Sequence, residues 1–104
     1  MSKPLQLGVS TTRLAKMDIT DALDWYNARS ADLGEAFVRV LNESLLRIQE
    51  HPEAAPLVWR ERVRQLVMNG FPYSVYYACQ RSRIRVVAVM HQRRDPRDWQ
   101  VRVK

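Results

Sequence analysis

Apolar residues recur at helical spacing through the first half of the chain, and this spacing predicts two amphipathic helices. The first runs from about Asp18 to Arg29, with Asp18 as its N-cap. The second is capped by Ser30 and continues to about Glu50, where Pro52 stops it, because proline disfavours helix in the residue before it. Its expected buried stripe is Leu33, Phe37, Val40, Leu41, Ser44 and Ile48. With almost no linker between them, the two helices should form a hairpin.

Alternation of apolar and polar residues predicts strands on both sides of this hairpin. The strands are expected at Leu5–Val9, Arg62–Met68, Tyr73–Gln80 and Ile84–His91. The region from 52 to 60, with two prolines, is expected to be a loop, and the segment from 99 to 103 could add a short final strand. The turns between the three later strands are short enough for antiparallel hairpins.

This order of elements predicts an α+β fold in one domain over residues 1–104. An N-terminal strand and a two-helix hairpin precede an antiparallel sheet of three to four strands, and the helices cover one face of that sheet. The other face is then open to solvent, and we expect the functional surface there.

The net charge of the chain indicates which kinds of molecule it would bind. Lys and Arg total 17 against 11 Asp and Glu, which gives a net charge of +6 and a pI near 10.1. This excess favours nucleic acid, an anionic surface or an acidic protein segment. Only Lys3, Lys16 and Lys104 are lysines. The predominance of arginine favours specific recognition of phosphates or carboxylates, because guanidinium groups offer a planar set of donors.

Several classes of protein are disfavoured. A lone cysteine, Cys79, cannot form an intrachain disulfide and is expected in the core. We expect a reduced, cytoplasmic protein without a membrane partner, because no apolar leader follows Met1 and no run approaches ~20 apolar residues. His, Cys, Asp and Glu lack metal-ligand spacing, and three glycines do not make a phosphate-binding loop. We therefore expect no cofactor and no metal.

Candidate chemistry gathers after the most apolar run, Ile84 to Met90, where the chain continues as His91-Gln92-Arg93-Arg94-Asp95-Pro96-Arg97-Asp98-Trp99. A solvated, charged terminus would be the ordinary explanation. His91 could transfer a proton near neutral pH, but catalysis also needs a second group and a phosphate clamp. Residues of suitable type are Glu61, Arg62, Arg64 and Arg94. Arg62 and Arg64, two apart on a strand, should project from one face, although a charged edge strand explains them as well.

The chain resembles the RelE/ParE superfamily of bacterial toxins from type II toxin–antitoxin systems. The matching pieces are Ala15-x-x-Asp18-Ile19-x-x-Ala22-x-x-Trp25-Tyr26, Leu33-Gly34-x-x-Phe37, Ile48-x-x-x-Pro52, Val63-Arg64, Phe71-Pro72-Tyr73-x-Val75-Tyr76-Tyr77 and Val86-x-Ala88-Val89-x-His91-x-x-Arg94-Asp95-Pro96-x-x-Trp99. They occur in the expected order over nearly the whole chain. The fold that this resemblance implies, a helix hairpin on an antiparallel sheet, agrees with the pattern above.

The resemblance implies a basic toxin that inhibits growth and is neutralised by a cognate acidic antitoxin. ParE-like members bind DNA gyrase, whereas RelE-like members cleave mRNA on the ribosome without a metal. The chain leans toward the ParE-like side and toward a non-enzyme, because its C-terminus lacks the tyrosine of several RelE-like nucleases. On this reading the target-binding residues are Arg62, Arg64, His91, Arg94 and Trp99.

Two alternatives stay open. A ribosome-dependent mRNA endoribonuclease would use Glu61, Arg64, His91 and Arg94, with Arg64 and Arg94 holding the scissile phosphate. An inactive relative would keep only antitoxin binding. The sequence also leaves open whether the chain forms a homodimer or a toxin–antitoxin hetero-oligomer.

Overall fold

Within residues 8–103, which the computed structural model describes, five strands form one mixed sheet in the order β1-β5-β4-β3-β2. The strands are β1 (Gly8–Thr11), β2 (Leu57–Trp59), β3 (Val63–Val67), β4 (Tyr73–Gln80) and β5 (Arg83–His91). β1 pairs parallel to β5, and the other neighbours are antiparallel. The predicted α+β fold is confirmed, with more strands than expected. The start of the predicted first strand, at Leu5 and Leu7, lies outside the described residues.

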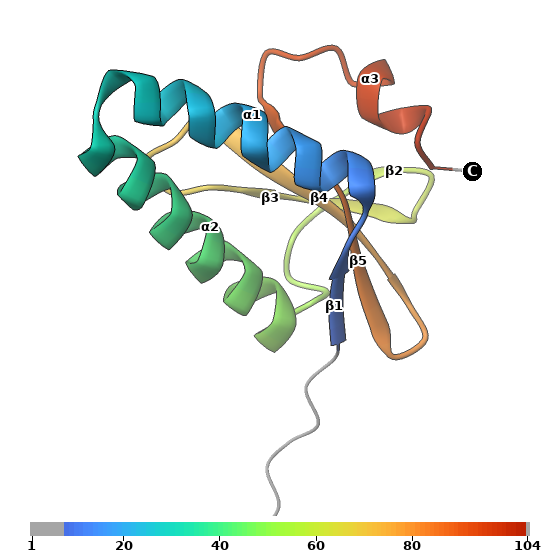
Figure 1. Cartoon of the computed structure of the whole chain (residues 1–104). Coiled ribbons are helices and arrows are strands. Elements are labelled where there is room, and N and C mark those ends of the chain that lie inside the picture. Colours follow the sequence, from blue (N-terminus) through green and yellow to red (C-terminus); the bar gives the residue numbers. More distant parts are fainter. Residues whose placement is uncertain (1–7, 104) are drawn as a thin grey trace, which may run out of the picture.

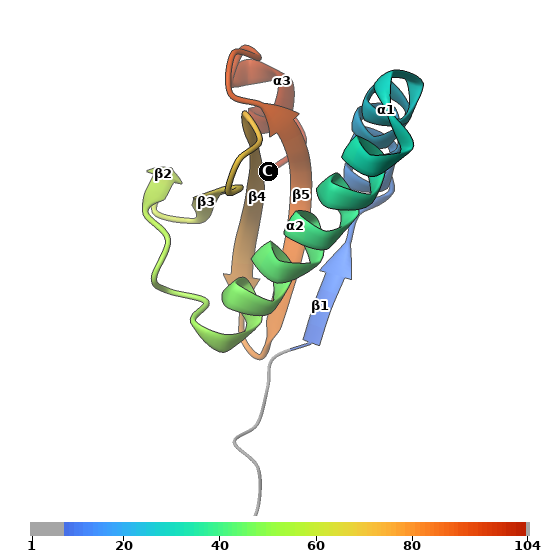
Figure 2. The same ribbon diagram turned by 90° about the vertical axis from the view of Figure 1, so that its left-hand side faces the viewer.

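Two long helices, α1 (Arg13–Arg29) and α2 (Ala31–Glu50), form the predicted hairpin on one face of the sheet (Figures 1 and 2). Ser30 separates them: its backbone N–H donates to Tyr26 and closes α1, while its hydroxyl accepts from the N–H of Asp32 at 3.1 Å and opens α2. Neither helix, nor any other in residues 8–103, is both long and apolar enough to cross a membrane.

The predicted N-cap of α1 is wrong. Thr12 caps this helix, and its hydroxyl accepts from the N–H of Ala15 at 3.1 Å. Asp18 therefore lies inside α1, where its carboxylate accepts from the N–H of Val89 and from Arg102. An aspartate is tolerated inside a helix when its side chain is used elsewhere, and here tertiary partners use it.

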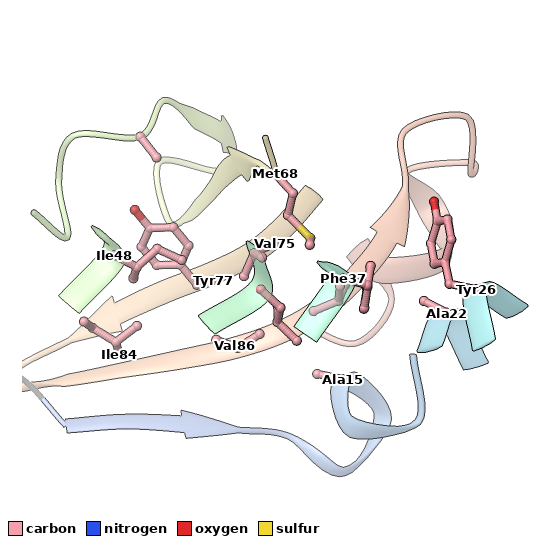
Figure 3. Close-up of a cluster of buried hydrophobic side chains, with 13 residues drawn as sticks. Ala15, Ala22, Tyr26, Phe37, Ile48, Met68, Val75, Tyr77, Ile84 and Val86 are labelled. Carbon is pink, nitrogen blue, oxygen red and sulfur yellow. The ribbon is translucent and has the colours of Figure 1, made fainter. Parts of the chain in front are cut away.

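The main core lies between the helical hairpin and the sheet. Phe37, Ile48, Tyr77 and Val86 are all buried there (Figure 3). Four members of the predicted stripe of α2 are buried, namely Phe37, Leu41, Ser44 and Ile48. Leu33 departs from that prediction, because 41% of its surface is exposed at the edge of the stripe.

A second apolar cluster covers part of the other sheet face, so the prediction of a wholly open face is wrong. Its buried members are Val63, Tyr76, Val87, Ala88, Met90 and Trp99. Trp99 belongs to a short helix, α3 (Arg97–Gln100), which replaces the strand considered for 99–103. A change of register opposite Tyr76 and Tyr77 leaves Val87 as the extra residue of a β-bulge. Val87 and Ala88 consequently both join this cluster.

Two connections also differ from the sequence prediction. The expected loop over 52–60 contains β2, a three-residue edge strand that pairs with β3. β3 begins at Val63, so Arg62 lies in the preceding turn, where its N–H donates to the carbonyl of Trp59. Because Arg62 precedes the strand, strand alternation does not govern its direction.

Candidate functional site

A groove of about 310 Å³ lies between α1 and the last residues of β5. Its polar and aromatic lining comprises Asp18, Asp21, Trp25, Tyr73, His91 and Arg94. Two of the predicted site residues, His91 and Arg94, therefore meet in one place. We call this the His91 groove.

His91 is held in a defined orientation at the end of β5. Its ring lies 5.4 Å from the ring of Tyr73, centre to centre, and its Nδ1 accepts from the N–H of Arg93 at 3.0 Å. This hydrogen bond leaves Nε2 as the nitrogen that can donate to a ligand. Burial raises the pKa of Tyr73, and the positive charge of Arg94 opposes that shift. The tyrosine is therefore a neutral hydroxyl at physiological pH.

Arg94 is exposed and is positioned by the turn that follows β5. Its Nε donates to Asp98 Oδ2 at 3.0 Å, on a pair whose side chains are 56% and 45% exposed. Asp95 makes a second such pair with Arg97, at 2.7 Å, and also accepts from the Arg97 N–H. Hydrogen bonds from Arg97 lower the pKa of Asp95. The sequence Arg-Asp-Pro-x-Asp thus folds into a locally paired turn that keeps Arg94 at the mouth of the groove.

Arg64 is used inside the protein. Its Nη1 donates to the carbonyls of Glu53 and Ala55 at 2.9 and 2.7 Å, which fastens the loop after α2 to β3. Arg64 lies opposite Tyr77, while His91 lies opposite Tyr73 on the other side of β4. The two residues are therefore separated by about 13 Å along the strands and about 10 Å across them.

Arg62 and Glu61 occupy the turn between β2 and β3. Both are exposed, and Glu61 has a left-handed backbone, with φ of 51°. Arg62 borders a hollow on the sheet face away from the helices, together with Arg85 and Arg102. The prediction that Arg62 and Arg64 project from one strand face is wrong, since the strand begins only at Val63.

Trp99 is a packing residue in this structure, with 3% of its surface exposed. Its ring stacks on Tyr76 at 4.5 Å and meets Trp59 edge-on at 5.9 Å. Nearby, Arg102 forms an ion pair with Asp18 at 2.7 Å and donates to the carbonyl of Val87. The C-terminal segment is thereby attached to both α1 and the bulge of β5.

The four residues of the nuclease alternative do not line one cavity. His91 and Arg94 share the His91 groove, whereas Arg64 and Glu61 lie elsewhere. Among the described residues, no three His, Cys, Asp or Glu side chains gather as a metal site would require. What the groove offers is an imidazole, a phenol, an exposed indole, one guanidinium and the carboxylates of Asp18 and Asp21, a set suited to binding.

Sequence reasoning missed several residues. Trp25, which is 49% exposed, and Asp21 both line the groove, and neither was among the predicted site residues. Asp18 and Arg102 are 84 residues apart in the sequence, so no local sequence pattern predicts their ion pair. Arg83 and Arg85 did have a signal: they alternate with the buried Ile84 and Val86, which assigns them to the face opposite the helices.

Comparison with known proteins identifies the family. The family model described as ParE toxin of type II toxin–antitoxin system, parDE, matches residues 9–96. The chain belongs to this ParE toxin family. The match begins in β1 and ends at Pro96, so it contains both long helices, strands β2 to β5 and the His91 groove, while Trp99 and Arg102 lie beyond it.

Solved structures share the fold described above, and one of them comes from a ParDE system. The chromosomal ParDE toxin–antitoxin system from P. aeruginosa matches with a TM-score of 0.73 and 18% sequence identity, over 82% of this chain and 95% of that chain. At this identity the likeness concerns the fold alone. No curated protein sequence matches the chain.

Proposed function

We propose that this ParE-family toxin inhibits growth by binding DNA gyrase rather than by catalysis. The observation that carries the proposal is the family match over residues 9–96. The geometry supports it, because Arg64 donates to loop carbonyls and lies apart from His91 and Arg94. Within residues 8–103, Arg64 and Arg94 therefore do not form the phosphate clamp that the nuclease alternative needs. A binding toxin needs only an exposed, positioned surface.

The proposed gyrase contacts are His91, Arg94 and Arg62, whose side chains reach the surface. Trp99 and Arg64, which the sequence also suggested, would contribute by holding α3 and the loop after α2 in place. Replacement of Arg94 should weaken gyrase inhibition without a large loss of stability, since its only carboxylate partner in residues 8–103 is the exposed Asp98.

A second candidate function is ribosome-dependent cleavage of mRNA. It is favoured by one observation: His91, Tyr73 and Arg94 line the same groove, so an acid–base group, a hydroxyl and a cation lie together. In that mechanism His91 would move the proton and Arg94 would contact the phosphate. His91→Ala would then reduce cleavage by orders of magnitude while leaving the fold intact.

We further propose that a cognate acidic antitoxin neutralises the toxin. The net charge of +6 suits such a partner, and the family description names a toxin–antitoxin system. Co-expression with a neighbouring small acidic protein should restore growth, and the two chains should co-purify.

The experiment is expression without the partner, followed by parallel measurement of plasmid supercoiling and transcript integrity. Gyrase binding predicts loss of supercoiling with intact transcripts, both in cells and with purified gyrase. Cleaved transcripts with normal supercoiling would favour the nuclease. Unimpaired growth with neither effect would leave an inactive relative.

A further inference from the structure

A second groove, lined by arginines, lies at the β4–β5 turn on the sheet face away from the helices. This turn is at the end of β5 away from α3 (Figure 1). Its larger part is a hollow of about 740 Å³ around the β4–β5 turn, lined by Ser10, Gln80, Arg81, Ser82, Arg83 and Arg85. Gln80 and Arg85 also line the smaller hollow that contains Arg62. The two hollows are therefore adjacent, and we call them together the hairpin groove.

Three arginines around the β4–β5 turn have no carboxylate partner in the part of the chain that the structure describes, whereas Arg102 of the smaller hollow is paired with Asp18. Arg81, Arg83 and Arg85 make no ion pair within residues 8–103, and no Asp or Glu lines either hollow. Arg83 and Arg85 lie on one strand face, about 7 Å apart, where their charges repel unless an anion lies over them. Arg81 has a left-handed backbone, with φ of 54°, a conformation that glycine and asparagine adopt more readily. The turn nevertheless has an arginine at this position, which adds a third positive charge to those of Arg83 and Arg85.

The lining indicates which kind of anion fits. Around the turn it consists of guanidinium, amide and hydroxyl groups, which are the side chains that contact phosphate and sugar in protein–DNA complexes. It contains no aromatic residue on which an unpaired base could stack, as binding of single-stranded RNA requires. It also lacks the large apolar anchors that dominate protein–protein contacts.

We infer that the hairpin groove binds the sugar–phosphate backbone of duplex DNA, without sequence preference, through Arg81, Arg83 and Arg85. The inference goes beyond the proposed function and does not depend on it. A duplex presents regularly spaced phosphates and no unpaired bases, so a row of donors without stacking surfaces suits it. The His91 groove lies at the other end of β5 and remains accessible in such a complex.

The test uses the purified full-length toxin and a fluorescent 20-base-pair duplex of mixed sequence. Anisotropy gives the binding constant between 50 and 200 mM KCl for the wild type and two triple variants. The hairpin variant is Arg81→Asn, Arg83→Gln and Arg85→Gln. The matched control removes the same charge from the helices through Arg13→Gln, Arg39→Gln and Arg47→Gln, residues outside both hollows.

Three phosphate contacts contribute about −2.7 to the slope of log K against log salt. The hairpin variant should lose that contribution, which corresponds to roughly a 40-fold smaller loss of affinity between 50 and 200 mM KCl. The control should keep the wild-type slope to within about one contact. A single Arg83→Gln variant should make the slope less steep by about 0.9. It provides a second measurement in case the triple variant does not fold.

Equal slope changes in the two triple variants would overturn the inference, because only diffuse charge would then be acting. It would also be overturned if 20-nucleotide single-stranded RNA or a polyglutamate peptide competed more strongly than unlabelled duplex. Circular dichroism and thermal midpoints should match among all variants. If the triple variant unfolds, the Arg83→Gln slope alone decides.

Discussion

The ion pair between Asp18 and Arg102 should be among the most important polar contacts for stability. Arg102 Nη1 and Nη2 donate to the two carboxylate oxygens at 2.7 and 3.1 Å, and Asp18 Oδ2 also accepts from the N–H of Val89 at 3.0 Å. The side chains of Arg102 and Asp18 are only 15% and 13% exposed. β1 ends at Thr11, so the backbone of β5 beyond Val86 pairs with no strand on that side. The side chains of Asp18 and Arg102 take the place of a strand there, because they form hydrogen bonds with the N–H of Val89 and the carbonyl of Val87.

The magnitude follows from what each substitution leaves behind. Arg102→Leu leaves a largely buried carboxylate with one backbone N–H as its partner, and removal of one member of a buried pair costs about 3–5 kcal/mol. The slight exposure of both groups lowers our expectation to about 2–4 kcal/mol. Asp18→Asn should cost a similar amount, because it strands the guanidinium. The double variant should cost about 2 kcal/mol less than the sum of the two.

Guanidinium chloride unfolding of the four proteins in this cycle measures these values, and thermal midpoints should fall by about 4–8 °C per kcal/mol. A loss below about 1 kcal/mol for Arg102→Leu would refute the reasoning, since that is the range of an exposed pair. Additive single and double variants would refute it as well. Arg97→Leu is the matched control: its pair with Asp95 is equally short but exposed, so its loss should be small.

The remaining predictions concern single residues. Trp99→Ala should lower the free energy of unfolding by about 3–5 kcal/mol, since Trp99 packs against Tyr76 and Trp59, while Trp99→Phe should cost much less; chemical unfolding measures both. Arg64→Met should cost about 1–3 kcal/mol by freeing two carbonyls, and the same purified variant should inhibit gyrase like the wild type once folded. Because its hydrogen bonds with Arg97 hold the folded pKa of Asp95 below its ordinary value, the contribution of this pair is complete above that value and fades as the pH falls; a carboxyl NMR titration of Asp95 that matches an unstructured peptide would contradict this.

Much of the fold could be predicted from local signals. Ser30, Pro52 and the apolar spacing between them gave α2 its bounds, because caps and proline act within one turn. The strands predicted at Tyr73–Gln80 and Ile84–His91 followed from apolar runs separated by short turns, and they are observed at Tyr73–Gln80 and Arg83–His91. The start of α1 was missed because Thr12 and Asp18 are both good caps, and only a tertiary contact, that of Asp18 with Val89, distinguishes them.

The candidate site was only partly predictable. Proximity of His91 to Arg94 is local and was foreseen, but the direction of Arg64 depends on the loop carbonyls it meets. The burial of Trp99 did have a signal. Residues Val86 to Met90 are buried without interruption, and a continuous apolar run indicates a strand covered on both faces. An open face at that end of β5 was therefore inconsistent with the sequence itself.

The same strand explains why two separate surfaces exist. At its start β5 alternates exposed and buried residues, so one face is free and carries Arg83 and Arg85. After the bulge at Val87 both faces of β5 are covered, by α1 on one side and by Trp99 on the other. Exposed polar groups therefore lie only at and beyond the end of the strand, where His91 and Arg94 line the His91 groove. Removing the cover should therefore affect the two surfaces differently. Trp99→Ala should disturb inhibition of the target through the turn that carries Arg94, while binding of a duplex at the hairpin groove should persist in the fraction that remains folded.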